Sequence, residues 1–368
     1  MMSLHIAING TALTKKQRTG VENFTVNLVI SLSKFDKSNR YTIILPGKPV
    51  VDIENDNITF CEIKSKYFWH RIALPRALGK VKPDIYLEPS YMLPARGNYK
   101  SIIVIHDLAS KYFPKAYTSH ERLMLNSTFK TAERASGIVF LSANTKKDFC
   151  KFYTIDSPCK IIYQSYDEKL YRRPENIVNP LGDIGRYILN VGRLETRKNI
   201  FNLIKAYEIL VSKYNISQKL ILVGKPGVGY EEIDKLINKL DPKTRDNVII
   251  AGFLEDSKMP HLYAGADLFV YPTLYEGFGI PILESFSCGT AVACSKTSSL
   301  PEVAGVAAIY FDPRKPEDIA EAINKLLSHS SLRGDLIKKS KTQIDKFSWE
   351  KCAEEFIEFF NSVSKENE

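Results

Sequence analysis

Short apolar runs alternate with segments of helical period along almost the whole chain. Many of the runs are continuous in Val, Ile and Leu, which is typical of strands buried on both faces. Helical segments between them, such as residues 21–35 and 119–135, supply the crossovers that parallel strands require. The pattern therefore predicts an α/β fold with doubly wound parallel sheets. The expected strands are residues 4–9, 41–45, 58–63, 84–87, 101–106, 137–141 and 160–163, followed by 187–191, 219–223, 248–251, 268–271, 291–294 and 308–311.

The chain length and the grouping of these runs predict two domains. With 368 residues the chain exceeds what one hydrophobic core normally serves. The polar segment 165–186 holds Pro174 and Pro180 and is the expected linker. A last helical pattern at 349–363 has a strong apolar face, so we expect it to pack back on the first domain. The expected division is two Rossmann-like domains, 1–170 and 171–348, facing one another across a cleft, and a return helix at 349–368.

Composition and cysteine usage exclude several classes of protein. Apolar residues make up 44% of the chain and charged residues 25%, which is ordinary for a globular protein. No apolar run approaches the roughly 20 residues that span a bilayer, and no signal-peptide pattern is present, so we expect a cytosolic protein. The six cysteines are scattered without C-x-x-C pairs and predict neither a zinc site nor a disulfide frame.

A net charge of +9 is compatible with nucleic acid, an anionic membrane or anionic small ligands as partners. Nucleic acid is not expected, because no zinc-finger spacing, aromatic RNA-binding signature or basic zipper accompanies the charge. Residues 64–82 mix bases with large aromatics, as helices lying on acidic lipid do. The alternative is an ordinary surface helix that packs Trp69 and Leu74 on the sheet. Peripheral contact with the inner face of the plasma membrane therefore stays open.

Two carboxylates frame a glycine turn near the C-terminal end. Glu276 and Glu284 enclose Gly-Phe-Gly-Ile-Pro-Ile-Leu, shortly after the apolar run 268–271. A strand followed by a glycine turn and a helix presents free backbone N–H groups and the positive end of a helix dipole, which suits a phosphate. Ionised carboxylates accept hydrogen bonds from sugar hydroxyls. The motif indicates an anionic nucleotide ligand; a loop Glu and an unrelated helix-surface Glu are the alternative.

A basic turn follows the expected strand 187–191. It sets Arg193, whose guanidinium forms a phosphate fork, and Lys198, which is a point charge, where a diphosphate fits. Arg197 lies between them and is expected to be solvated. Ligands bind beyond the carboxyl ends of strands in α/β sheets, which favours a binding role for Arg193 and Lys198 over a plain basic turn.

Three weaker signals also follow expected strands. Gly20 precedes a helix after the first strand, and His106 ends the strand at 101–106. Phe253 follows the strand at 248–251, where a backbone edge suits a nucleobase. Each also fits a helix-entry glycine, a structural histidine or a core aromatic, so only their position favours a function.

Taken together, these motifs resemble the retaining, GT-B-fold glycosyltransferases of family 4, which transfer sugars from nucleotide-sugar donors. The resemblance runs from the Gly20 loop through G-R-L-x-x-x-K at 192–198 and E-G-F-G-x-P-x-L-E at 276–284 to the return helix. It implies an N-terminal acceptor domain and a C-terminal donor domain. The first loop departs from the family's usual glycine pair with a nearby Arg, since Thr19-Gly20 and Asn23 stand there.

The resemblance also assigns roles. It implies that Arg193 and Lys198 grip the donor diphosphate, that Glu276 holds hydroxyls of the transferred sugar, and that His106 lies near the reacting centre. Glu284 would hold the ribose. The donor-binding residues that it implies are Gly20, Phe253, Leu254, Gly277, Phe278, Gly279, Ile280 and Glu284.

The details of the motifs bear on substrate and cofactor. His106-Asp107 and Arg197-Lys-Asn-Ile200 look most like bacterial O-antigen and polysaccharide mannosyltransferases, which favours GDP-mannose over a UDP-sugar and a saccharide or lipid-linked saccharide as acceptor. No cofactor and no metal are expected, because no D-x-D motif follows a strand. A nucleotide-sugar epimerase, a phosphorylase and a non-catalytic nucleotide-sugar binding protein of the same fold are the alternatives.

Overall fold

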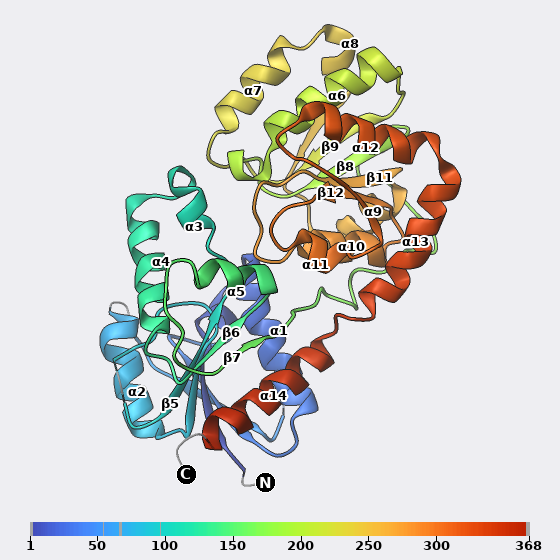
Figure 1. The fold of residues 1–368 in the computed structure, drawn as a ribbon. Helices are drawn as coiled ribbons and strands as arrows, with labels where there is room; N and C mark the ends of the chain where they lie inside the picture. The colour runs from blue at the N-terminus through green and yellow to red at the C-terminus, as the bar shows by residue number, and fades with distance from the viewer. Residues whose placement is uncertain (1–2, 54, 66–67, 96, 366–368) are drawn as a thin grey trace. The chain divides into compact units, whose positions relative to one another are not determined.

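The protein is described by a computed structural model, which covers residues 3–53, 55–65, 68–95 and 97–365. It divides into two compact units (Figure 1). Unit 1 comprises Met1–Gln164 and Ser348–Glu368, and unit 2 comprises Ser165–Phe347. The sequence placed the first boundary at 170/171, whereas the structure has it at 164/165. The expected linker therefore belongs to unit 2, where Tyr171 is buried and packs edge-on against the ring of Tyr263.

Unit 1 holds a parallel sheet of seven strands in the order β3-β2-β1-β4-β5-β6-β7. The strand order reverses between β1 and β4, so helices cover both faces. The strands are β1 (His5–Asn9), β2 (Arg40–Leu45), β3 (Ile58–Glu62), β4 (Ile85–Glu88), β5 (Lys100–Ile105), β6 (Gly137–Phe140) and β7 (Cys159–Ile161). The helices are α1 (Gly20–Phe35), α2 (Leu74–Val81), α3 (Ala109–Tyr112), α4 (Ser119–Ala132), α5 (Ala143–Phe149) and α14 (Trp349–Lys365), with the short turns η1 (Thr11–Thr14), η2 (Trp69–Ala73) and η3 (Pro114–Ala116).

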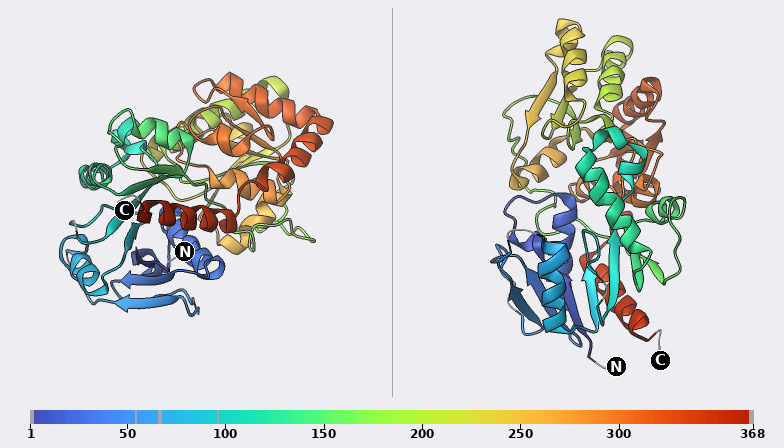
Figure 2. Two further views of the ribbon diagram at one scale, coloured as in Figure 1. Left: turned by 60° about the horizontal axis from the view of Figure 1, so that its bottom comes forward. Right: turned by 90° about the vertical axis from the view of Figure 1, so that its left-hand side faces the viewer.

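Helix α14 completes the core of unit 1. It lies beside α1 (Figures 1 and 2), and its buried Phe356 packs against Phe24 with ring centroids 6.3 Å apart. Gly137, at the start of β6, lets the helix approach the sheet, because a Cβ there would lie 2.9 Å from the Val363 side chain. The predicted return of the last helix to the first domain is therefore confirmed.

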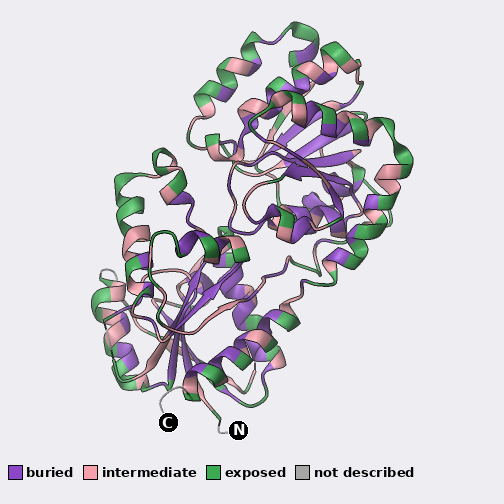
Figure 3. Cartoon of the chain, viewed as in Figure 1, coloured by how far each residue is buried: buried purple, intermediate pink, exposed green. Residues whose placement is uncertain are grey.

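Unit 2 holds a second parallel sheet, of six strands in the order β10-β9-β8-β11-β12-β13. The central strands of both sheets are buried (Figure 3), as their continuous apolar sequences predict, whereas the edge strands β3, β7 and β10 are partly exposed. The strands are β8 (Tyr187–Val191), β9 (Lys219–Val223), β10 (Val248–Gly252), β11 (Leu268–Tyr271), β12 (Val292–Ser295) and β13 (Ala308–Phe311). The helices are α6 (Ile200–Tyr214), α7 (Tyr230–Lys239), α8 (Pro242–Arg245), α9 (Met259–Gly265), α10 (Ile280–Ser287), α11 (Leu300–Ala304), α12 (Pro316–Ser328) and α13 (Ser330–Ile344), with η4 (Thr196–Lys198) and η5 (Asp256–Lys258).

The predicted fold class, an α/β protein with two doubly wound parallel sheets, is confirmed. Every predicted strand is present, and its ends agree with the observed ones within two residues. In both units the order 3-2-1-4-5-6 creates one place where neighbouring loops leave the sheet toward opposite faces, and this is where α/β proteins bind ligands.

Candidate functional site

In unit 2 the strand order reverses between β8 and β11, so the loops that follow these two strands lie side by side. Two hydrogen bonds join them. The backbone N–H of Leu274 and the hydroxyl of Thr273 donate to the carbonyl oxygen of Arg197 at 2.9 and 3.1 Å. The two sequence motifs that were singled out separately, around Lys198 and Glu276, therefore form one site.

Lys198 and Glu276 are in direct contact at this site. The ammonium nitrogen of Lys198 lies 2.5 Å from Oε1 of Glu276 and donates to the hydroxyl of Tyr271 at 2.8 Å. The hydroxyl of Thr273 also donates to Oε1, at 3.0 Å. The side chains of Lys198 and Glu276 are only 13% and 12% exposed. The structure thus brings together the residue expected at the diphosphate and the residue expected at the sugar.

The charge state of Glu276 follows from this environment. Burial by itself favours the neutral acid, but Lys198 and Arg197 stabilise the carboxylate more strongly, with help from Thr273, and they hold its pKa at about 2. Glu276 is therefore an ionised acceptor for hydroxyl groups. A carboxylate neutralised by two cations is also a weak nucleophile.

Arg197 is not the solvated residue that the sequence suggested. Its guanidinium is 14% exposed and donates to Oε1 of Glu276 at 3.2 Å, to the carbonyl of Tyr275 at 2.8 Å and to Oε1 of Glu195 at 3.0 Å. The expectation was wrong because two of the three acceptors, Tyr275 and Glu276, come from a loop almost eighty positions away, which the sheet topology places beside it.

Arg193 presents the opposite case. Its side chain is 66% exposed, and its Nε lies 3.7 Å from Oε2 of Glu195, which is beyond hydrogen-bond distance. The guanidinium can therefore turn toward a ligand at little cost. Arg193 leaves the same sheet edge as Lys198 but takes no part in the contact with Glu276.

The glycine turn after β11 is held by α11 and the loop before it. The hydroxyl of Ser299 donates to the carbonyls of Glu276 and Phe278 at 2.9 and 2.7 Å. Gly279 has φ of 121° and precedes α10, a backbone conformation that favours glycine. The Phe278 side chain is buried against the edge of Phe347, so at this position only the backbone is available to a ligand. Gly277 and Ile280 flank these residues in the turn and at the first position of α10.

Glu284 lies within α10, in a different environment. It accepts a hydrogen bond from the hydroxyl of Tyr263 at 2.7 Å. Burial raises its pKa to about 7, although hydrogen bonds from Tyr263 and Tyr171 oppose the change. Glu284 is thus poised between charged and neutral forms near neutral pH, whereas Glu276 is fixed as a carboxylate.

Phe253 and Leu254 follow β10, on the far side of β9 from the charged cluster. Phe253 is 62% exposed, and the ammonium group of Lys225 lies 4.7 Å from its ring centroid. This exposed ring is not core, as one reading of the sequence allowed. It gives a flat platform with a cation beside it, which suits a planar base.

A glycine-rich loop that the sequence reasoning passed over joins these parts. Residues 224–229, Gly-Lys-Pro-Gly-Val-Gly, follow β9 and pair with the loop after β8. The N–H of Leu194 donates to the carbonyl of Lys225 at 3.0 Å, and the N–H of Gly227 donates to the carbonyl of Leu194 at 2.9 Å. Gly224 has φ of 147°, and a Cβ there would lie 2.0 Å from the carbonyl oxygen of Gly192. Three glycines after an apolar strand were the signal that could have found it.

In unit 1, Gly20 and His106 come after strands β1 and β5, whose carboxyl ends lie at the same edge of the sheet. Gly20 is the first residue of α1, after a capping box between Thr19 and Glu22. His106 donates from Nε2 to the carbonyl of Pro89 at 2.7 Å and meets the ring of Phe24 edge-on. Burial lowers the pKa of His106, so the imidazole is neutral.

A buried carboxylate that the sequence reasoning missed occupies the reversal point of the unit 1 sheet, between β1 and β4. Glu88 accepts hydrogen bonds from Asn9 at 3.1 and 3.0 Å, from Tyr86 at 2.6 Å and from the backbone of Tyr91 at 3.1 Å. The His70 Nε2 lies 3.8 Å away. Burial raises the pKa of Glu88 to about 7 against the effect of these donors.

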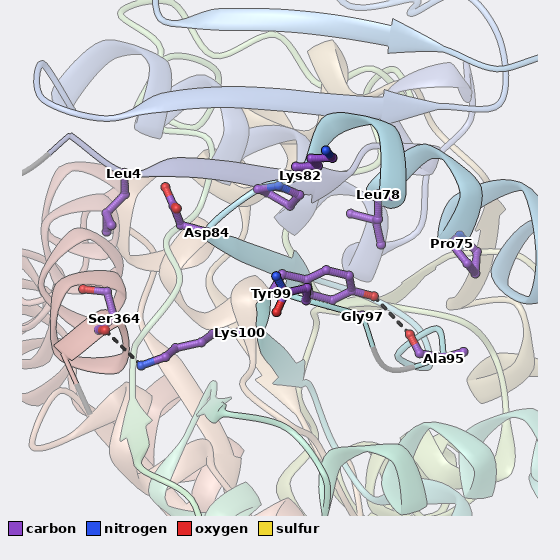
Figure 4. Close-up of a pocket in the computed structure, with 13 residues that line it drawn as sticks. Leu4, Pro75, Leu78, Lys82, Asp84, Ala95, Gly97, Tyr99, Lys100 and Ser364 are labelled. Carbon is purple, nitrogen blue, oxygen red and sulfur yellow. Dashed lines mark hydrogen bonds between the residues drawn. The ribbon is translucent and has the colours of Figure 1, made fainter. Parts of the chain in front are cut away.

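A groove of unit 1 lies apart from these residues. Figure 4 shows an open groove of about 830 Å³ at the amino ends of β4 and β5 in unit 1, lined by Asp84, Tyr99 and Lys100 among others. Lys100 donates there to the last carbonyls of α14, from Val363 and Ser364, at 2.8 and 2.9 Å. The groove contains none of the predicted site residues and faces away from the edge where α/β sheets bind ligands.

The described part of the chain also bears on other functions. Among these residues no group of three or more His, Cys, Asp and Glu side chains is arranged to hold a metal ion. None of the described helices is long and apolar enough to cross a membrane.

Known proteins share both the sequence and the fold. Residues 176–343 match the family described as glycosyl transferases group 1. The fold matches that of sucrose-phosphate synthase from Thermosynechococcus elongatus, with a TM-score of 0.80 and 18% identity, covering 98% of this chain and 99% of that one. It also matches Anabaena HepE in complex with UDP and glucose, with a TM-score of 0.74 and 17% identity, covering 98% of this chain and 100% of that one. The architecture is that of the GT-B glycosyltransferases.

A closer sequence relative fixes the family. The chain is 32% identical over 303 residues to the O-antigen chain mannosyltransferase B of Escherichia coli, a match that covers 78% of each protein. The chain belongs to the group 1 glycosyltransferases and is a glycosyltransferase. The resemblance noted in its motifs is therefore confirmed at the level of enzyme class and fold.

Proposed function

We propose that the protein transfers mannose from GDP-mannose to a saccharide or lipid-linked saccharide in the synthesis of a bacterial surface polysaccharide, with retention of configuration. The observation that carries the proposal is the cluster of Arg193, Lys198 and Glu276 at the reversal point of the unit 2 sheet. The similarity to an O-antigen chain mannosyltransferase supports mannose as the sugar.

The cations of this cluster suit a leaving nucleoside diphosphate. Glycosyl transfer passes through an oxocarbenium-like state while negative charge grows on the diphosphate. Arg193 is exposed and free to turn, and Lys198 sits on a flexible stem at the same edge. Cations that meet this growing charge stabilise the transition state more than the ground state. They supply this charge from the protein itself, so the proposed reaction uses neither a metal nor a cofactor.

Glu276 suits the sugar. It is ionised, and the hydrogen bonds from Lys198, Arg197 and Thr273 all end on one carboxylate oxygen, Oε1. Since two cations make it a weak nucleophile, we favour front-face attack, in which the departing diphosphate takes the proton of the acceptor hydroxyl. Glu284 would then bind the ribose, and the exposed ring of Phe253 the base.

A ligand panel tests this proposal. Nucleoside diphosphates and nucleotide sugars that bind the folded protein raise its melting temperature by mass action. We expect GDP and GDP-mannose to stabilise the protein more than UDP and UDP-glucose. A preference for UDP compounds would move the donor to a UDP-sugar, as the UDP complex of HepE illustrates for that protein. No response to any nucleotide would refute the donor site.

Binding alone does not separate an enzyme from a sensor, so a turnover assay completes the test. Release of GDP from GDP-mannose in the presence of oligomannose or lipid-linked saccharide acceptors should depend on the acceptor. Glu276→Gln should reduce turnover far more than it reduces affinity for GDP, since the proposal assigns Glu276 to the sugar. Equal losses in both quantities would contradict that placement.

A specific surface favours contact with anionic lipid. In the stretch 64–82, of which Lys66 and Tyr67 lie outside the described residues, Trp69 and Leu74 pack inward, but Phe68 and Ile72 are 65% and 42% exposed. The exposed side chains beside them include Arg71, Arg76 and Lys80. Apolar and basic side chains on one exposed surface suit a membrane that carries acidic headgroups.

Flotation with liposomes of phosphatidylglycerol checks this contact. Binding should fall with added salt and should be lost in the double variant Phe68→Ser, Ile72→Ser, whereas vesicles of phosphatidylcholine alone should not bind. Absence of binding to acidic vesicles at low salt would refute it.

A further inference from the structure

Arg197 donates three hydrogen bonds within the site and is one of the two cations beside Glu276. We propose that Arg197, with Glu195 as its counter-charge, is a positioning residue that fixes Glu276 for the sugar and does not bind the diphosphate. The inference rests on the proposed function of the same site and extends it to a residue that the ligand does not touch.

The contacts of Arg197 clamp two loops together. Its Nη1 donates to the carbonyl of Tyr275 and to the carboxylate of Glu276, and its Nη2 donates to the carboxylate of Glu195. Its own carbonyl accepts two hydrogen bonds from residues 273 and 274. The side chain and the backbone of one residue thus hold the whole segment 273–276 in register with the loop after β8.

The planar fork is what makes this possible. Tyr275 and Glu276 offer a carbonyl and a carboxylate to one nitrogen, while Glu195 meets the next nitrogen of the same rigid plane. A lysine has the charge but presents a single point donor on a flexible stem. The geometry therefore requires arginine, and charge alone does not satisfy it.

Arg197 and Arg193 differ in how firmly their contacts hold them. Both contact Glu195, but Arg197 does so at 3.0 Å with 14% of its side chain exposed, and Arg193 at 3.7 Å with 66% exposed. Moving Arg197 onto a ligand would break three hydrogen bonds, each costly to lose in a buried site. Arg193 loses only a loose ion pair. We therefore assign the diphosphate to Arg193, which is exposed, whereas Arg197, which is buried, stays in place.

Glu195 keeps Arg197 in place when a diphosphate binds. Charges alternate from Arg193 through Glu195, Arg197 and Glu276 to Lys198. An arriving diphosphate attracts every cation in reach, and the buried carboxylate of Glu195 opposes that pull on Arg197. Among the described residues Lys198 forms an ion pair with Glu276 alone, so it can leave Glu276 for the diphosphate while Arg197 keeps Glu276 charged and oriented.

The test separates affinity for the nucleotide from turnover. In Arg197→Met we expect kcat to fall about 100-fold, the order of loss that follows a misplacement of about 1 Å, while the Kd of GDP changes less than threefold. In Arg197→Lys we expect a similar loss of kcat, since charge without the fork does not restore the position of Glu276. Arg245→Met is the matched control and should leave both quantities unchanged, because Arg245, the last residue of α8, forms an ion pair of 3.6 Å with Asp246 directly after that helix.

The pH profile distinguishes positioning from general damage. Removing the Arg197 cation leaves Glu276 facing Lys198, Tyr271 and Thr273. The pKa of Glu276 should therefore rise, and the acid limb of kcat should shift to higher pH in Arg197→Met. Arg197→Lys should keep that limb near its original position. Glu195→Gln, which preserves the shape of the side chain, should reproduce part of the kcat loss.

Each other outcome overturns the inference. A loss of GDP affinity in Arg197→Met as large as that in Arg193→Ala would make Arg197 a diphosphate ligand. An unchanged kcat would remove the positioning role, and so would an unshifted acid limb. If Arg197→Met does not fold, full activity of Arg197→Lys and Glu195→Gln decides against the clamp. Failure of the unaltered protein to bind any nucleotide would instead refute the proposed function.

Discussion

Replacing Glu276 by Gln should change how the stability of unit 2 depends on pH. The ordinary pKa of the carboxyl group is 4.5, and the site holds it at about 2. That displacement corresponds to roughly 3 kcal/mol of unfolding free energy when the group is ionised. Because the folded pKa lies below the unfolded one, this contribution is present above about pH 4.5 and is lost as the pH falls toward 2.

Urea unfolding measured at several pH values checks this magnitude. Both tryptophans, Trp69 and Trp349, lie in unit 1, so tryptophan fluorescence follows that unit, whereas far-UV circular dichroism follows both. Between pH 7 and pH 3, the stability of unit 2 in the unaltered protein relative to Glu276→Gln should fall by about 2 kcal/mol. The tryptophan transition should show no such difference.

Glu284→Gln supplies a control of opposite sign. The pKa of Glu284 is raised to about 7, so its favourable contribution is fully present below about 4.5 and is lost as the pH rises through 7. The unaltered protein should therefore lose stability relative to Glu284→Gln over that range. A pH-independent difference for Glu276→Gln, or the same sign for both variants, would refute the electrostatic account of the site.

Three further substitutions probe other parts of the structure. Arg193→Ala should weaken GDP binding at least tenfold without changing stability, because its side chain is 66% exposed; titration calorimetry and melting temperature check both. Phe356→Ala should lower the unfolding free energy of unit 1, followed by tryptophan fluorescence, by about 3–5 kcal/mol. Glu354 is exposed on the same helix, so Glu354→Ala should change this free energy very little. A loss below about 1 kcal/mol for Phe356→Ala would contradict the packing of α14. Gly224→Ala forces a Cβ within 2.0 Å of the Gly192 carbonyl oxygen, so unit 2 should lose at least about 2 kcal/mol and GDP affinity should drop; an unchanged melting temperature would contradict this close approach.

The sequence was sufficient for the fold because its signals are local. Continuous apolar runs mark strands buried on both faces, and their ends could be read within two residues. The apolar face of α14 predicted that the helix is buried. Because it follows the last strand of the second sheet, we expected it to pack on the first domain. The boundary near residue 165 was less visible, because a polar segment with prolines fits a linker and the burial of Tyr171 depends on a partner far along the chain.

The site was only partly predictable because its contacts are not local. Lys198 and Glu276 were each singled out, but only the strand order brings them to 2.5 Å. The contacts of Arg197 depend on the same strand order, so the sequence wrongly suggested that this buried residue is solvated. Glu88 was missed partly for the same reason, since one of its donors, Asn9, is 79 positions away, although Tyr86 and Tyr91 are near it in the chain.

The discontinuity of unit 1 constrains how the chain acquires its structure. Residues of α14 fill the core against Phe24 and Gly137, yet they are synthesised only after the whole of unit 2. During translation unit 2 can finish folding first, while unit 1 waits with the apolar groove beside α1 uncovered. A ribosome that stalls before Trp349 would release a chain with unit 2 folded and the apolar groove of unit 1 exposed. Chaperones and proteases would recognise that exposed apolar surface.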